Sequence, residues 1–280
     1  MSIRLSASTG LLQYQAIEEA ARTLARLGFD GMEIWATLTM PPYEHGAGSR
    51  TRLRELCRSL NLAIVGTHGV LPPTEHRVLS NDDAERQRGV DYMRAVIDMT
   101  AELGGTVVTV GAPGARNRPA GVPPDLAWSR MRDAFATWAD HAATTGLRVS
   151  IEIVNRYEAD SFRTIDEGLA FVRELGRPNL GLTPDTFHMN IDEGPFGAAI
   201  RRGGRDVFQM HAADNNRQAP GEGNLDFGEF AGALRDVGYD GYWSLELFEE
   251  YYGIKLRHAP EEALAKGLAH LRRVIGEVYD

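Results

Sequence analysis

A short pattern that joins the end of a helix to a strand recurs along this chain, and it constrains the fold more than any other feature of the sequence. Residues 27–35 read LGFDGMEIW, and residues 237–246 read VGYDGYWSLE. Each contains a glycine suited to the left-handed turn that ends a helix, and an apolar, strand-like run follows within a few residues. Related joints lie at 102–110, 145–153 and 174–182. The chain is therefore expected to alternate helices with strands.

Short apolar runs predict eight strands, at residues 3–7, 31–35, 62–67, 106–110, 147–153, 179–183, 206–211 and 241–247. Helical patterns lie between them, at residues 13–27, 49–60, 83–103, 125–145, 163–175, 194–202, 227–236 and 260–277. Continuous apolar runs are typical of parallel strands buried on both faces. This alternation predicts an α/β protein, a single (β/α)8 TIM barrel over residues 1–280. The alternative, a doubly wound open sheet, usually has fewer strands, and no G-x-G-x-x-G follows the first strand.

The composition disfavours several classes of protein and of partner. Hydrophobic residues make up 43% of the chain, and no apolar run approaches the roughly 20 residues of a membrane span. The first residues lack the apolar stretch of a signal peptide, and Cys57, the one cysteine, cannot form an internal disulfide. A cytoplasmic protein is therefore expected, with Cys57 as a buried structural thiol. The formal net charge of −9 argues against nucleic acid as a partner.

Three carboxylates and one imidazole stand at the ends of four consecutive predicted strands: Glu152, Asp185, His211 and Glu246. The carboxyl ends of barrel strands meet at one mouth, where barrel active sites are built. A charged glutamate inside an apolar run such as SIEIV is costly unless it is paired, hydrogen-bonded or bound to a metal. Each residue alone is more often structural, but the four together predict a divalent metal site. Mostly oxygen ligands suit Mn²⁺, with Co²⁺ or Mg²⁺ as alternatives.

Longer segments around these residues carry a resemblance to a known family. Residues 152–158 (EIVNRYE), 185–190 (DTFHMN), 211–217 (HAADNNR) and the late Glu246 are similar to segments of the D-tagatose 3-epimerase and D-psicose (allulose) 3-epimerase group. That group belongs to the sugar isomerase and epimerase barrels, the xylose isomerase-like TIM-barrel superfamily. The resemblance spans nearly the whole chain, including the helical segment within 80–105.

The resemblance implies a role for each residue. The metal ligands would be Glu152, Asp185, His211 and Glu246, and the proton-transfer pair would be Glu152 and Glu246. The substrate, a free ketose, would be bound by Glu158, His188 and Arg217, and the protein would form a homodimer or homotetramer. The family often has Pro after the first glutamate and Leu before Asn-Arg, whereas this chain has Ile153 and Val154. The pocket wall and the substrate preference therefore stay open.

Two further residues, Glu33 and His68, belong to the second and third predicted strands and are expected to face the same mouth. Either could contact the substrate or hydrogen-bond the metal ligands, and His68 is predicted to be a substrate contact.

The chemistry of these residues suits epimerisation of a ketose at C3. The reaction removes a proton next to the carbonyl and returns one to the opposite face, which two carboxylates on opposite sides of the substrate can do. A metal bound by two substrate oxygens would stabilise the enediolate formed between the two steps. Aldose–ketose isomerisation and inosose dehydration are alternatives within the same superfamily. A non-catalytic sugar-binding barrel is disfavoured because both proton-transfer glutamates are present.

Overall fold

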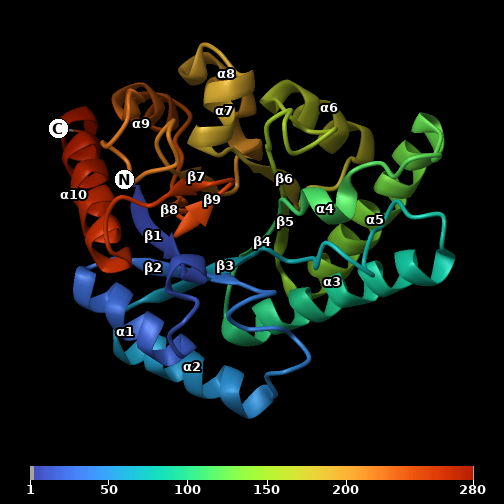
Figure 1. Ribbon diagram of the computed structural model, residues 1–280, viewed down its shortest axis with the longest axis horizontal. Coiled ribbons are helices and arrows are strands. Elements are labelled where there is room, and N and C mark those ends of the chain that lie inside the picture. The colour runs from blue at the N-terminus through green and yellow to red at the C-terminus, as the bar shows by residue number, and fades with distance from the viewer. Residues whose placement is uncertain (1–2, 280) are drawn as a thin grey trace.

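Eight parallel strands form the centre of the computed structural model, which describes residues 3–279 (Figure 1). They are β1 (Arg4–Ser8), β2 (Gly31–Trp35), β3 (Ala63–His68), β4 (Val107–Val110), β5 (Arg148–Glu152), β6 (Leu180–Thr183), β7 (Met210–Ala212) and β8 (Tyr242–Leu245). Their order is β6-β5-β4-β3-β2-β1-β8-β7. Parallel bridges from Leu182 to Val207 and from Asp185 to His211 join the two ends of this order, at β6 and β7, and so close the sheet. The strands thus form a barrel, and the predicted fold class is confirmed.

Helices surround this barrel (Figure 1). The longer ones are α1 (Ile17–Leu27), α2 (Ala47–Ser59), α3 (Asp83–Leu103), α5 (Pro124–Thr145), α6 (Ile165–Leu175), α8 (Phe196–Gly203), α9 (Phe227–Asp236) and α10 (Pro260–Tyr279). The predicted glycine joints end four of them: Gly28, Gly104, Gly146 and Gly176 have φ between 61° and 94°. Among residues 3–279, no helix is both long enough and apolar enough to cross a membrane.

Apolar side chains cover both faces of the sheet. Every residue of β4, β6 and β7 is buried, as expected for strands with the core on one side and helices on the other. Between α5 and α6, the rings of Phe135, Phe162 and Phe171 pack with centroids 4.8 to 6.0 Å apart. This aromatic cluster joins the two helices to the segment that follows β5.

Some short elements differ from the prediction. Residues 9–12 form a 3-10 turn, η1 (Thr9–Leu12), and the first helix begins only at residue 17. Strand β7 has only three residues, 210–212, and a 3-10 turn, η2 (Gly204–Asp206), lies shortly before it. Helices α4 (Pro113–Arg116) and α7 (Thr186–Asp192) and the hairpin of β9 (Glu250–Tyr251) and β10 (Ile254–Lys255) were not predicted. These elements follow β4, β6 and β8, and they are too short to carry a helical or strand period.

Candidate active site

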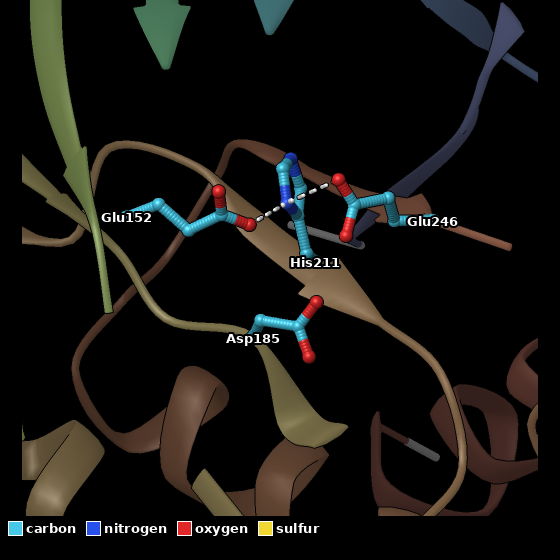
Figure 2. Close-up of side chains that lie close together, drawn as sticks. All are labelled: Glu152, Asp185, His211 and Glu246. Atoms are coloured by element: carbon cyan, nitrogen blue, oxygen red, sulfur yellow. Dashed lines mark hydrogen bonds and ion pairs between the residues drawn. The ribbon is translucent and has the colours of Figure 1, made fainter. Parts of the chain in front are cut away.

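The four residues at the predicted strand ends lie together in a buried cluster. Glu152 ends β5, Asp185 follows β6, His211 lies within β7 and Glu246 directly follows β8. Figure 2 shows Glu152 and Glu246 on opposite sides of the His211 ring, with the Asp185 carboxylate beside them. One ligand atom from each residue lies within 4.8 Å of those of the others. The barrel thus brings these donors together from four consecutive strands.

Local features hold two of these carboxylates in place. Asp185 caps α7, since its Oδ1 accepts the backbone N–H groups of Phe187 at 2.7 Å and His188 at 3.2 Å, which leaves its Oδ2 for partners within the site. Glu152 lies against Gly111, where an added Cβ would be 2.0 Å from Glu152 Oε2. The buried guanidinium of Arg116 donates to the Glu152 carbonyl at 3.3 Å. Gly111 therefore provides the space for the Glu152 carboxylate, and Arg116 supports the end of the strand.

His211 lies between carboxylates on both sides of its ring. Its Nδ1 is 2.8 Å from Glu152 Oε1, and its Nε2 is 3.0 Å from Glu33 Oε2. Burial lowers the pKa of His211, but the charges of Glu33, Glu246 and Glu152 outweigh burial and raise it well above its ordinary value. Burial likewise raises the pKa of Glu33, but His211 and His68 outweigh it and hold this pKa at about 2. The Glu33 carboxylate is therefore ionised inside the barrel.

Arg217 bridges two of the clustered carboxylates. Its Nη1 donates to Asp185 Oδ2 at 2.9 Å, and its Nη2 donates to Glu246 Oε2. The guanidinium carbon also lies 4.7 to 4.9 Å from the ring centroids of Phe187, Phe248 and Tyr251. Although burial lowers the pKa of Arg217, the charges of Asp185 and Glu246 raise it above its ordinary value.

Neighbouring charged residues also shift the pKa of Glu246. Burial raises its pKa, but Arg217 and His211 outweigh burial and lower it well below its ordinary value. Glu246 is thus an ionised carboxylate at neutral pH.

The remaining predicted contacts fall into two groups. His68 belongs to the cluster, since its Nδ1 lies 3.1 Å from Glu246 Oε1 and its Nε2 lies 2.6 Å from Ser8 Oγ. Glu158 and His188 form a second network around Asn155, whose Nδ2 lies 2.8 Å from Glu158 Oε1 and 2.6 Å from His188 Nδ1.

Tyr251 connects the two groups, because its hydroxyl donates to Glu158 while its ring packs on Arg217. Sequence reasoning missed Ser8, Gly111 and Gln209, whose Nε2 donates to Glu33 at 3.3 Å. Of these, only Ser8 carried a signal, since it ends the first strand as the ligand candidates end theirs.

The donor set fits a divalent metal. Octahedral ions such as Mg²⁺ hold oxygen ligands at about 2.1 Å, so opposite ligands lie about 4.2 Å apart. Donor atoms within 4.8 Å of one another need only small side-chain shifts to reach that geometry. Three carboxylates and one imidazole suit an oxygen-preferring ion and leave coordination positions for substrate oxygens. The fold and the site together define a barrel with a buried acidic cluster, able to hold a metal ion, at the carboxyl end of its strands.

Comparison with known proteins gives the family. The family model described as xylose isomerase-like TIM barrel matches residues 21–274. L-ribulose 3-epimerase of Mesorhizobium japonicum is 32% identical over 83% of this chain and 77% of its own, and D-psicose 3-epimerase of Agrobacterium fabrum is 32% identical over 80% and 77%. A solved structure of L-ribulose 3-epimerase superimposes with a TM-score of 0.87 at 26% identity, covering 99% of this chain and 96% of the other.

The chain belongs to the xylose isomerase-like TIM barrel family, and within it to the group of the D-psicose and L-ribulose 3-epimerases. It is accordingly an enzyme of the isomerase class.

Proposed function

We propose that this protein is a metal-dependent ketose 3-epimerase that interconverts free ketohexoses or ketopentoses at C3. The observation that carries the proposal is the pair of buried carboxylates in the donor cluster, Glu152 and Glu246, which lie on opposite sides of the His211 ring (Figure 2). The family supports it, because the curated relatives at 30% identity or more include ketose, D-psicose and L-ribulose 3-epimerases. Mn²⁺ is the proposed metal, bound by Glu152, Asp185, His211 and Glu246.

Epimerisation needs one base and one acid on opposite faces of the same carbon. One glutamate takes the C3 proton of the ketose, and the other delivers a proton to the opposite face of C3. In the reverse direction the two glutamates exchange these roles. When bound, the divalent ion supplies positive charge next to the substrate oxygens that become negative as the proton leaves.

Other residues control the two glutamates and the sugar. Arg217 and His68 both contact Glu246 and keep its carboxylate ionised and oriented. We propose that Arg217 and His68 also contact the sugar from the mouth side, and that Glu158 and His188 bind its hydroxyl groups. These residue types suit that task because a carboxylate accepts hydrogen bonds from sugar hydroxyl groups, and a neutral imidazole can both donate to them and accept from them.

The experiment is chromatographic detection of C3 epimers from D-fructose, D-tagatose and L-ribulose. The protein is first stripped of metal and then supplied with Mn²⁺, and Glu152→Gln and Glu246→Gln are assayed in parallel. The proposal predicts epimers that require the metal and vanish in both variants. Aldoses or dehydrated products would instead assign the protein to an isomerase or dehydratase of the same family. Metal binding with no turnover of any ketose would reject the 3-epimerase proposal for these sugars.

A second candidate function is 4-epimerisation of a 3-keto sugar, and the same assay should include such a substrate. 3-Dehydro-D-guloside 4-epimerase of Escherichia coli is 28% identical over 91% of this chain and 94% of its own length. That sequence alignment covers more of both chains than the sequence alignments with the two 3-epimerases of Mesorhizobium japonicum and Agrobacterium fabrum do. The proton chemistry would be the same, but at C4, the carbon next to the C3 ketone of a sugar ring. Turnover of a 3-keto-glycoside in preference to free ketoses would favour this candidate.

A further inference from the structure

The inference concerns Glu33, a charged residue that lies inside the barrel. Glu33 belongs to β2 and is 0% exposed. Its Oε2 lies 3.0 Å from His211 Nε2 and accepts a hydrogen bond from Gln209 Nε2 at 3.3 Å. Gln209 is itself 1% exposed. Glu33 thus contacts a proposed metal ligand, at the ring nitrogen of His211 that does not face Glu152 and Glu246.

The two ring nitrogens of His211 face different partners. Nδ1 lies 2.8 Å from Glu152 Oε1 and 3.8 Å from Glu246 Oε1, so it points into the donor cluster. Nε2 points to Glu33. A neutral imidazole has one N–H and one lone pair, and only the lone pair can bind a metal. A carboxylate at Nε2 holds the proton there and leaves the Nδ1 lone pair for the ion.

We propose that Glu33 is a positioning residue that fixes the tautomer and the ring orientation of His211 for metal binding, and that Gln209 holds Glu33 in place. The inference rests on the proposed metal-dependent function. Histidine ligands in metalloproteins usually donate their second N–H to a carboxylate or carbonyl, and loss of that partner typically weakens the metal site.

A purely structural role explains Glu33 poorly. Among the residues that the structure describes, its Oε1 has no hydrogen-bond partner, and neither do the buried hydroxyls of Ser6 and Ser244. A buried charge with an unsatisfied oxygen is costly for folding, and an apolar residue of similar size often packs at least as well. Glu33 contacts the neutral amide of Gln209 and the titratable imidazole of His211, and only the imidazole gains from a charged partner, so the benefit of retaining the charge lies at His211.

The test measures Mn²⁺ affinity in the 280-residue protein without substrate, by titration calorimetry and by the EPR signal of free Mn²⁺. Glu33→Gln keeps the shape of the side chain and removes its charge, and Gln209→Met removes only the hydrogen bond to Glu33. Glu85→Gln is the control, because Glu85 is also buried (4% exposed) but pairs with Arg77 at 2.7 Å, outside the cluster. We expect about 10- to 100-fold weaker binding for Glu33→Gln, roughly two- to tenfold for Gln209→Met and no change for Glu85→Gln.

A readout specific to the ligand sphere accompanies the affinities. The visible absorption of bound Co²⁺ should shift in Glu33→Gln and stay unchanged in Glu85→Gln. Folded Glu33→Gln with the affinity and spectrum of the starting protein would overturn the proposal. If Glu33→Gln does not fold, Gln209→Met decides, and unchanged affinity in that variant would overturn it.

These measurements need no substrate, so the two proposals can fail separately. Weaker metal binding in Glu33→Gln, together with a starting protein that epimerises no sugar, would reject the proposed function and keep the role of Glu33.

Discussion

Replacement of Gly111 by alanine should disable the site while leaving the barrel folded. The added Cβ would lie 2.0 Å from Glu152 Oε2, and contacts of Cβ below 3.0 Å essentially do not occur, so the carboxylate oxygen must move by at least 1.0 Å (3.0 minus 2.0). The clash involves the end of a flexible side chain, and Gly111 does not have a positive φ, so the cost to folding is small. A displacement of about 1 Å at a catalytic group typically costs about 100-fold in rate, or about 2.7 kcal/mol.

The assay combines kcat for the best ketose, Mn²⁺ affinity and the midpoint of urea unfolding. The matched control is Gly232→Ala, because nothing lies within 4 Å of a Cβ added on that residue of α9. We expect kcat to fall about 100-fold in Gly111→Ala and to stay unchanged in the control. Full activity and unchanged metal affinity in a folded Gly111→Ala protein would refute the reasoning, because Glu152 would then not need its present position.

Three further predictions concern Cys57, Glu33 and the metal. Burial raises the pKa of Cys57 to about 11, so a thiol reagent at neutral pH should label it only after unfolding in guanidinium, and rapid labelling of the native protein would contradict this. The pKa of Glu33 is lowered from 4.5 to about 2, so its contribution to stability is present above pH 4.5 and lost as the pH falls towards 2. Between pH 4.5 and pH 3 the metal-free protein should lose about 2 kcal/mol more in its free energy of unfolding than Glu33→Gln does, and equal losses by urea unfolding would count against the pairing with His211. Mn²⁺ at about 100 times its dissociation constant should stabilise the protein by about 2.7 kcal/mol and raise Tm by on the order of 5 °C, and calorimetry with no shift would show that the folded state gains nothing from the ion.

The sequence was informative where a signal repeats or lies within one short segment. Apolar runs without alternation predicted the parallel strands, and glycine joints such as Gly28 and Gly104 predicted the helix ends, because a left-handed C-cap favours glycine. The four donors were noticeable because a carboxylate or imidazole at the end of an apolar run is unusual in the same position on four strands.

Features that depend on closure of the barrel could not be predicted from sequence. Glu33 and His211 are 178 residues apart, and only the closed arrangement of strands brings Nε2 to Oε2. Sequence position placed Glu33 at the mouth, but its side chain lies inside the barrel and is 0% exposed. His68, predicted to be a substrate contact, hydrogen-bonds Glu246 and Ser8, which lie on neighbouring parts of the barrel but far along the chain.

The short helix α7 shows a second kind of limit on prediction. Its seven residues are too few for a hydrophobic period, and it begins because Asp185 caps it. The same carboxylate that marks the site in the sequence thus also starts a helix, which only the structure reveals.

The most direct test of the account is the fate of the C3 hydrogen when the metal-loaded enzyme turns over a ketose in D₂O. Two glutamates that remove a proton from one face and deliver another to the opposite face predict an epimer with solvent deuterium at C3, seen by NMR, and no deuterium at C1. An epimer that keeps its original C3 hydrogen, or deuterium found only at C1 or C2, would contradict proton transfer at C3 by Glu152 and Glu246.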